Sequence, residues 1–138
     1  MVSRPDSISV CSYLPASWMT SLPDDLGFSA TSYVAEDIQK RYHAIRHLNW
    51  RRDRNDNPIE KNIRTGTQRD AAVVQTRGHE RIDEFACLDC REGNDPFEEC
   101  VVCILPDGRT IGKGACANCY WGGKPDRCSF RRRYLFPP

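Results

Sequence analysis

Cysteine is the residue type whose spacing in this sequence most clearly indicates chemistry. The chain has 138 residues and eight cysteines, seven of them between positions 87 and 128. Without Cys103 the pattern is C-x2-C-x9-C-x15-C-x2-C-x8-C. A C-x2-C pair places two sulfurs on one tight turn, where they can take two corners of a tetrahedral metal site. The six predicted metal ligands are Cys87, Cys90, Cys100, Cys116, Cys119 and Cys128.

Zinc explains this spacing better than a disulfide framework. The first residues lack the basic region, apolar run and small-residue cleavage site of a secreted chain. A 42-residue cysteine segment buries too little apolar surface to fold unaided, and a structural zinc contributes about 10–16 kcal/mol of folding free energy. We therefore predict one or two zinc ions and an intracellular protein, nuclear or cytoplasmic. A single ion on Cys87, Cys90, Cys116 and Cys119 is the alternative to two ions on six cysteines.

Two cysteines lie outside this ligand set. Cys11 stands alone near the N-terminus, and an isolated cysteine is more often a small hydrophobe than a ligand. Cys103 lies inside the apolar run Val101–Leu105. The sequence leaves the roles of both open.

The net charge of +1 is unevenly distributed along the chain. Between residues 40 and 81 there are 11 basic and 5 acidic residues, a net charge of +6, whereas residues 87 to 128 carry 5 basic and 7 acidic residues, a net charge of −2. Arg131–Arg133 form a second basic patch. No apolar run approaches the roughly 18 residues that a membrane span needs. We therefore expect neither a membrane partner nor a small-molecule substrate.

Two helices are expected before the cysteines. A helix over 32–51, capped by Ser32, follows from apolar residues spaced three or four apart: Val34, Ile38, Tyr42, Ile45 and Leu48. A second helix is expected to begin at the capping-box sequence Thr67–Asp70 and to end at Arg77 and Gly78.

A hairpin is expected between the two C-x2-C pairs. Val101–Leu105 is a β-type run, Pro106–Gly108 favours a turn, and Arg109–Ile111 can return as the partner strand. The predicted fold is therefore a small, irregular α+β module stabilised by zinc, with a β-hairpin preceded by two helices. We divide the chain into an N-terminal extension (1–30), a helical basic region (31–82), a cysteine-rich zinc module (83–133) and a tail (134–138).

Residues 64–131 resemble a fungal cysteine-rich domain family of unknown function. The resemblance rests on Thr67–Ala72 and Arg77-Gly78 in the lead-in, on the run Cys116–Gly123, and on Arg127–Arg131 at the end. The family has no assigned activity, so the resemblance implies none. In the family pattern Cys103 is an addition, which is why it is left out of the preferred ligands.

A looser similarity is to the fungal zinc binuclear-cluster transcription factors, in which six cysteines hold two zinc ions. By that resemblance Cys87 and Cys116 bridge both metals. Those factors carry Lys and Arg between their second and third cysteines, where a short helix meets DNA. Here residues 91–99 hold one basic and four acidic residues, which would repel phosphate.

Two non-enzymatic functions follow from these residues. The first is a regulatory or scaffold module that binds another protein, with Trp121 as an aromatic anchor. The alternative is nucleic-acid binding, since 16 of the 20 basic residues are Arg, which suits phosphate contacts. We do not expect an enzyme, because no histidine lies within residues 87–128 and the sulfur sites look closed. The candidate contacts are Arg51, Arg52, Arg54, Arg131, Arg132, Arg133 and Trp121.

Overall fold

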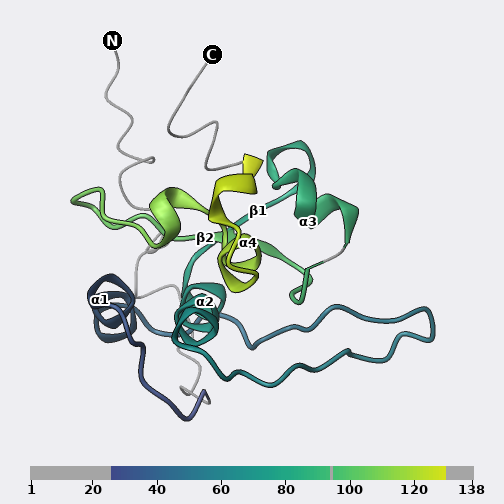
Figure 1. Ribbon diagram of the computed structural model, residues 1–138, viewed down its shortest axis with the longest axis horizontal. Helices are drawn as coiled ribbons and strands as arrows, with labels where there is room; N and C mark the ends of the chain where they lie inside the picture. Colours follow the sequence, from purple (N-terminus) through teal and green to yellow (C-terminus); the bar gives the residue numbers. More distant parts are fainter. Residues whose placement is uncertain (1–25, 94, 130–138) are drawn as a thin grey trace.

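Helix α2, Gly66–Arg77, is the element around which the fold is arranged in the computed structural model, which describes residues 26–93 and 95–129. Every residue from Asp70 to Gly78 is buried. Helix α1, Tyr33–Arg41, lies beside α2, while helix α4, Ala117–Trp121, and strand β2, Cys100–Val102, pack against its other sides (Figure 1). Ala71 and Ala72, both fully buried, are the small side chains of α2 among its larger buried residues.

The start of α2 is fixed by a capping box. Gln68 N–H donates to Thr65 Oγ1 at 3.1 Å, and Thr65 N–H donates to Gln68 Oε1 at 3.2 Å. At the other end, Gly78 N–H donates to Val74 O at 2.7 Å. The second predicted helix is therefore confirmed, although its cap lies at Thr65 and not at Thr67.

Helix α1 is shorter than predicted. Ser32 caps it as expected, with its Oγ accepting from Ala35 N–H at 3.2 Å, but the helix ends at Arg41 and not at residue 51. The chain beyond it is held by carbonyls at the end of α2, which have no partner within the helix: Ile45 N–H donates to Thr76 O at 2.8 Å. Tertiary hydrogen bonds thus override the helical periodicity of residues 42–51.

The segment between α1 and α2 leaves the body of the molecule as a long loop (Figure 1). Part of it forms a small antiparallel turn, in which Ile59 N–H donates to Arg51 O at 2.8 Å. The carboxylate of Asp53 closes the tip by accepting from the N–H groups of Asn55 and Asn57 at 2.8 and 3.0 Å. All residues from 52 to 62 are exposed.

Two strands form a small antiparallel sheet. Strand β1, His79–Arg81, pairs with β2 so that His79 lies opposite Val102 and Arg81 opposite Cys100. The predicted α+β fold class, with two helices followed by an antiparallel strand pair, is confirmed. The predicted turn at Pro106–Gly108 is present, with Leu105 N–H bonded to Arg109 O at 2.9 Å. Its return strand is reduced to a single bridge between Ile104 and Thr110.

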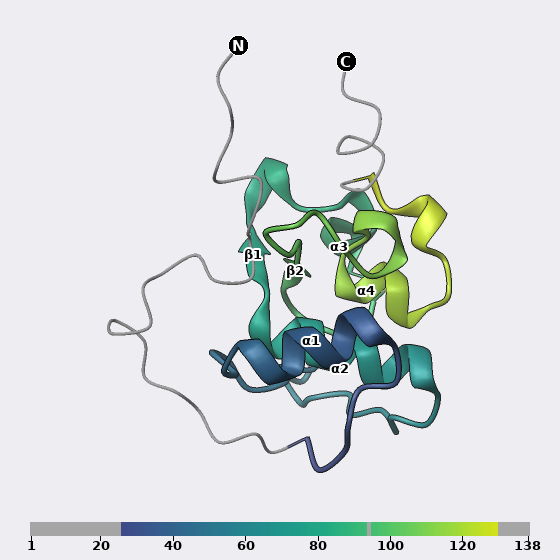
Figure 2. The same cartoon turned by 90° about the vertical axis from the view of Figure 1, so that its left-hand side faces the viewer.

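The core has an apolar part and a sulfur part. The apolar part lies between α1, α2 and β2, and the sulfur part collects six cysteines with small apolar neighbours such as Ala86 and Ala115. Short helices surround the sulfur part above α1 and α2 (Figure 2): α3, Leu88–Glu92, α4, and the single turns Asp83–Phe85, Gly112–Gly114 and Pro125–Arg127. Within the described part of the chain, no helix combines the length and apolarity needed to span a bilayer.

Asp70 joins the two long helices. Its carboxylate, 1% exposed, accepts from Thr31 N–H at 2.7 Å and from Ser32 N–H at 3.1 Å. Thr31 Oγ1 lies 3.1 Å from both carboxylate oxygens. The buried charge of α2 therefore satisfies the backbone at the entrance to α1, which fixes α1 beside α2.

Gly78 provides a test of how tightly α2 approaches the sheet. A Cβ placed there would lie 2.7 Å from Val101 Cγ1 and closer still to Val102 O. We therefore expect Gly78→Ala to lower the free energy of unfolding by about 1–3 kcal/mol, as overpacking of a core does. Gly122→Ala is the matched control, because the nearest atom to its Cβ would be 3.8 Å away and its φ of −77° suits alanine. Denaturant titration measures the free energy of unfolding of both variants. Equal unfolding midpoints for Gly78→Ala and Gly122→Ala would contradict the close approach of α2 to β2.

Candidate metal centre

Two short helices present the cysteine pairs in the same way. Cys87 is the N-cap of α3 and Cys90 lies in its first turn, while Cys116 is the N-cap of α4 and Cys119 lies in its first turn. A cap residue and the residue three positions later lie on the same side of a helix start. Each C-x2-C pair therefore aims both of its sulfurs in one direction, toward the other pair.

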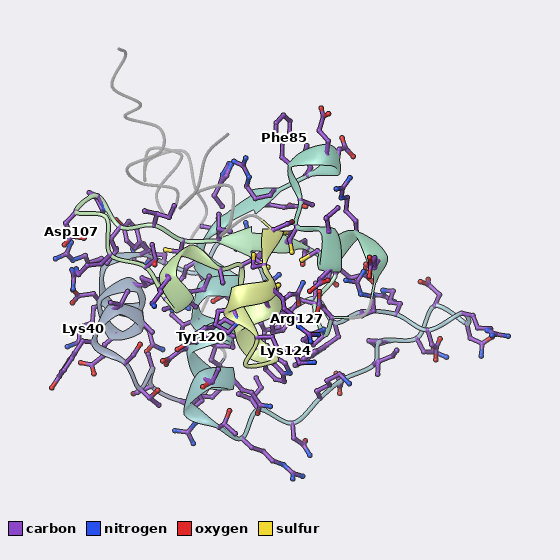
Figure 3. All side chains as sticks on the ribbon, turned by 45° about the horizontal axis from the view of Figure 1, so that its top comes forward. Lys40, Phe85, Asp107, Tyr120, Lys124 and Arg127 are labelled. Atoms are coloured by element: carbon purple, nitrogen blue, oxygen red, sulfur yellow. The ribbon has the colours of Figure 1, made fainter. Side chains whose placement is uncertain are left out.

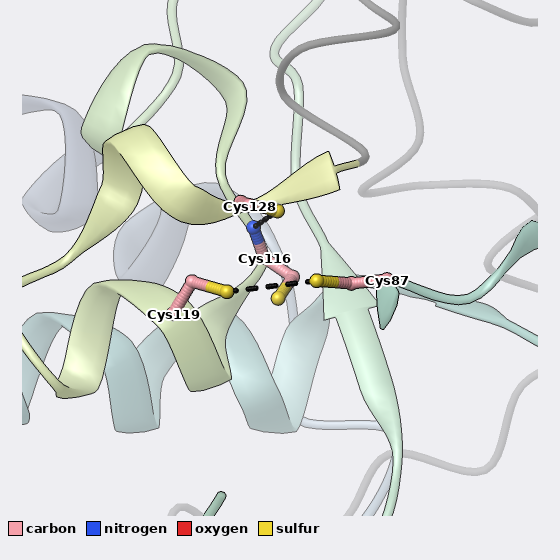
Figure 4. Close-up of side chains that lie close together, drawn as sticks. All are labelled: Cys87, Cys116, Cys119 and Cys128. Atoms are coloured by element: carbon pink, nitrogen blue, oxygen red, sulfur yellow. Dashed lines mark hydrogen bonds between the residues drawn. The ribbon is translucent and has the colours of Figure 1, made fainter. Parts of the chain in front are cut away.

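The six predicted cysteine ligands come together in two sulfur groups. One contains Cys87, Cys116, Cys119 and Cys128 (Figure 4), and the other contains Cys90, Cys100 and Cys116. Within each group all sulfurs lie within 4.8 Å of one another. Cys116 belongs to both groups, so the two groups share a sulfur and form one continuous site.

The sulfur distances fit a tetrahedral metal site. Cys87 Sγ lies 3.6 Å from Cys119 Sγ, and Cys90 Sγ lies 3.7 Å from Cys116 Sγ. Two thiolates on one tetrahedral zinc, each with a bond of about 2.3 Å, are separated by about 3.8 Å. A disulfide would require about 2.05 Å. All six thiols are free and no more than 7% exposed, so the groups are preformed and shielded from water.

The two halves of the site repeat one hydrogen-bonding pattern. Cys87 N–H donates to Cys100 Sγ at 3.3 Å, and Cys116 N–H donates to Cys128 Sγ at 3.3 Å (Figure 4). The first cysteine of each C-x2-C pair thus orients the isolated cysteine that follows it. A backbone N–H donated to sulfur stabilises the thiolate form, which is the form that binds a metal.

Contacts among the crowded sulfurs lower the pKa of one thiol and raise the pKa of others. Hydrogen bonds from Cys116 and Cys90 lower the pKa of the Cys100 thiol to about 4. Hydrogen bonding with Cys100 raises the pKa of Cys90 and of Cys116. The ionisation of one thiol therefore opposes that of its neighbours. Divalent cations among the sulfurs would remove this opposition.

Asn118 is a functional residue that sequence reasoning missed, because it lies between two cysteines as an apparent spacer. Its amide is 1% exposed. Oδ1 accepts from Phe97 N–H at 2.9 Å, while Nδ2 lies 3.2 Å from Phe97 O, 3.1 Å from Glu99 O and 3.3 Å from Cys90 Sγ. Asn118 thus fastens the segment that leads into Cys100 to the second knuckle. A polar residue between paired cysteines is the only sequence signal for it.

Of the predicted Arg contacts, Arg51 is occupied within the fold. Its guanidinium donates to the carbonyls of Asp95, Phe97 and Cys90 at 3.1, 3.0 and 3.4 Å. Arg51 therefore braces the acidic segment between Cys90 and Cys100. Two predicted contacts, Arg52 and Arg54, are exposed on the long loop, where Arg52 bonds Asp56 O at 2.8 Å. The predicted contacts Arg131, Arg132 and Arg133 lie outside the described residues, as does Cys11.

Trp121, the predicted aromatic anchor, packs in a cluster of three rings. Its ring meets those of Trp50 and Phe97 edge-on, with centroids 5.9 and 5.4 Å apart. The ring is only partly buried and borders a cavity of about 510 Å³ beside Cys119. Lys124 and Arg127, which follow α4, border the same cavity (Figure 3).

A second surface feature lies on the connection from β1 to the start of α3. Ile82, Phe85 and Leu88 are 57%, 53% and 52% exposed. Phe85 projects outward from the single turn Asp83–Phe85 (Figure 3), and the guanidinium of Arg81 lies over its ring at 5.6 Å. We call these three residues the apolar patch. The periodicity of the sequence gave no indication of it.

Cys103 contributes no thiol to either sulfur group. It is buried in the apolar part of the core and disulfide-bonded. Leaving it out of the ligand set is therefore consistent with its position.

Comparison with known proteins gives a family match over part of the chain but no function. No curated protein and no solved structure matches the chain. Residues 71–131 match a family described as "Protein of unknown function (DUF3716)", and this span contains both sulfur groups but somewhat less than half of the 138 residues. The resemblance to a cysteine-rich family of unknown function is thereby supported: residues 71–131 form a DUF3716 domain whose cysteines gather in one buried site.

Proposed function

We propose that the six cysteines hold two zinc ions and that the resulting module is a non-enzymatic scaffold that binds another protein. The observation that carries the proposal is the sharing of Cys116 between two sulfur groups at tetrahedral spacing. Buried sulfur ligands in tetrahedral arrangement are typical of zinc. Metal binding would supply folding energy that the small core alone lacks.

Two ions account for the six sulfurs better than one. With two shared sulfurs, six cysteines give each ion four ligands, and Cys116 is one sulfur in the required position. We propose Cys87 as the second, by the resemblance to the binuclear-cluster factors, and its N–H reaches Cys100 of the other group at 3.3 Å. Six thiolates and two dications leave a net charge of −2, which is far less costly to bury than six thiolates.

A structural role follows from the completeness of each ligand set. A catalytic zinc keeps one position open for water or substrate. In the proposed arrangement each ion has four sulfurs and no open position. We therefore propose that the metals shape the module and take no part in a reaction.

The apolar patch supports a protein as the partner. Ile82, Phe85 and Leu88 are each more than half exposed, on a short segment that includes Cys87. Large apolar side chains left exposed close together in the chain are candidates for a protein-binding surface. Metal binding at Cys87 would hold this segment rigid, so that a partner pays little entropy to order it.

Nucleic-acid binding is the alternative, and the long loop favours it. Arg52, Arg54, Lys61 and Arg64 are exposed on this projection, where they could follow a phosphate backbone. The segment between Cys90 and Cys100, where the resembling transcription factors contact DNA, is acidic and is braced by Arg51.

The metal content provides the first test. We expect native mass spectrometry to find two zinc ions per chain. Cys100→Ser and Cys128→Ser should each bind fewer than two ions and lose the folded module, since a structural zinc contributes about 10–16 kcal/mol. Ile111→Val is the control, a conservative change at a buried apolar residue of the same segment that should retain both ions. One ion per wild-type chain, or two ions in either ligand variant, would contradict the assignment.

The protein-binding surface can be tested with a displayed library of random twelve-residue peptides selected on the zinc-loaded protein. We expect the enriched peptides to bind at least tenfold more weakly to a variant with serine at Ile82, Phe85 and Leu88. Tyr33→Ser is the control, because Tyr33 is 87% exposed but lies on α1. If the selected peptides bind the patch variant as tightly as wild type, the apolar patch is not the protein-binding surface.

The alternative predicts salt-dependent binding to DNA or RNA. If nucleic acid is the partner, the affinity should fall steeply between 50 and 200 mM salt, and replacing both Arg52 and Arg54 with Glu should weaken binding at every sequence tested. Fluorescence anisotropy with a labelled duplex and a labelled single strand measures this. Absence of binding at the lower salt concentration removes the alternative.

A further inference from the structure

The two C-x2-C pairs differ at one equivalent position. Asp89 precedes Cys90 in the first pair, and Asn118 precedes Cys119 in the second. Each of these side chains reaches across to the last cysteine of the other pair. Asn118 Nδ2 donates to Cys90 Sγ at 3.3 Å, whereas Asp89 Oδ2 lies 3.9 Å from Cys119 Sγ. The two cysteine pairs are therefore arranged alike, but Cys90 faces an amide N–H donor and Cys119 faces a carboxylate.

Hydrogen-bond donors are consequently divided unequally between the two sulfur groups. Apart from the shared sulfurs, one group has Cys90 and Cys100, and both receive an N–H, from Asn118 and from Cys87 respectively. The other group has Cys128, which receives Cys116 N–H, and Cys119, which faces a carboxylate instead. Cys119 is the sulfur at which the two groups differ.

This difference acts on the metal bond. An N–H donated to a bound thiolate disperses its negative charge and disfavours its attack by protons or electrophiles. A carboxylate beside a thiolate does the opposite, because like charges at close range in a poorly solvated site repel each other. The proposed cluster already carries an excess charge of −2, so Asp89 adds to an existing repulsion.

The packing around the two groups reinforces the same difference. Asn118 also bonds Phe97 and Glu99, so the segment carrying Cys100 is fastened to α4. Cys119 borders the cavity of about 510 Å³ together with Asp89, whereas Cys90 and Cys100 border a cavity of about 250 Å³. The Cys119 side therefore has more room for a competing ligand.

We infer that the two metal positions are unequal: the position formed with Cys90 and Cys100 retains its ion, and the position formed with Cys119 and Cys128 exchanges its ion first. Asp89 acts through the Cys119 thiolate and makes this second ion exchangeable. The inference rests on the proposed two-ion cluster. It gives the module a one-metal state that a thiol or chelating partner can reach without removing both ions.

The test is stepwise removal of zinc from the full chain by EDTA at constant pH, followed by native mass spectrometry. Wild type should pass through a one-zinc species. Alkylation with iodoacetamide during this interval, mapped by peptide mass spectrometry, should modify Cys119 before Cys90 or Cys100. Asp89→Asn removes the charge and nearly preserves the shape, so it should slow loss of the first ion by about tenfold, the lower end of the effects seen for groups that contact metal ligands.

Asp56→Asn is the matched control. It makes the same charge change on a side chain 87% exposed, on the long loop, and asparagine tolerates the positive φ of 65° at this position. The rate at which this control loses its first zinc ion should match that of wild type. The inference is overturned if both ions leave together, if Cys90 or Cys100 is alkylated first, or if Asp89→Asn releases zinc as fast as Asp56→Asn. Fewer than two ions before EDTA is added would instead overturn the two-ion proposal itself.

Discussion

The repulsion that six closely spaced, buried cysteine sulfurs would have as thiolates is the constraint on which the structure depends. Two pairs of sulfurs lie 3.6 and 3.7 Å apart, in a site where none of the six cysteines is more than 7% exposed. Full ionisation without cations would place several like charges in a poorly solvated space, and full protonation would leave the converging backbone donors without strong acceptors. Dications would satisfy the arrangement, and the two C-x2-C turns, the acidic segment and α4 all lie around the sulfurs that would hold them.

The site was more predictable from the sequence than the fold around it. Cysteine ligands at C-x2-C spacing depend on local geometry, so all six predicted residues could be placed in advance, and the structure gathers them in two groups. The end of α1 could not be predicted from local pattern. Ile45 continues the apolar spacing of a helix, but its backbone N–H is bonded to Thr76 O at the end of α2. The partner of β2 was equally hidden, since His79–Arg81 carries polar side chains without a strand pattern.

Two residues show why function is harder to read than ligation. Arg51 looked suited to phosphate, yet its guanidinium is bonded to three carbonyls of the acidic segment. Asn118 looked like a spacer, yet it joins that same segment to the second cysteine pair. Both roles depend on carbonyl positions far away in the chain. Such positions exist only after folding and leave no pattern in the sequence.

The burial of α2 has a consequence for how the chain folds. Helix α1, which precedes α2 in the chain, and the sheet and α4, which follow it, all pack against α2. Its capping box lets α2 form early as a local structure, but α4 reaches it only after about forty intervening residues have been made. A nascent chain therefore exposes the apolar faces of α2 until the second cysteine pair has emerged. Metal capture and the closure of the apolar core would then belong to the same late, cooperative event.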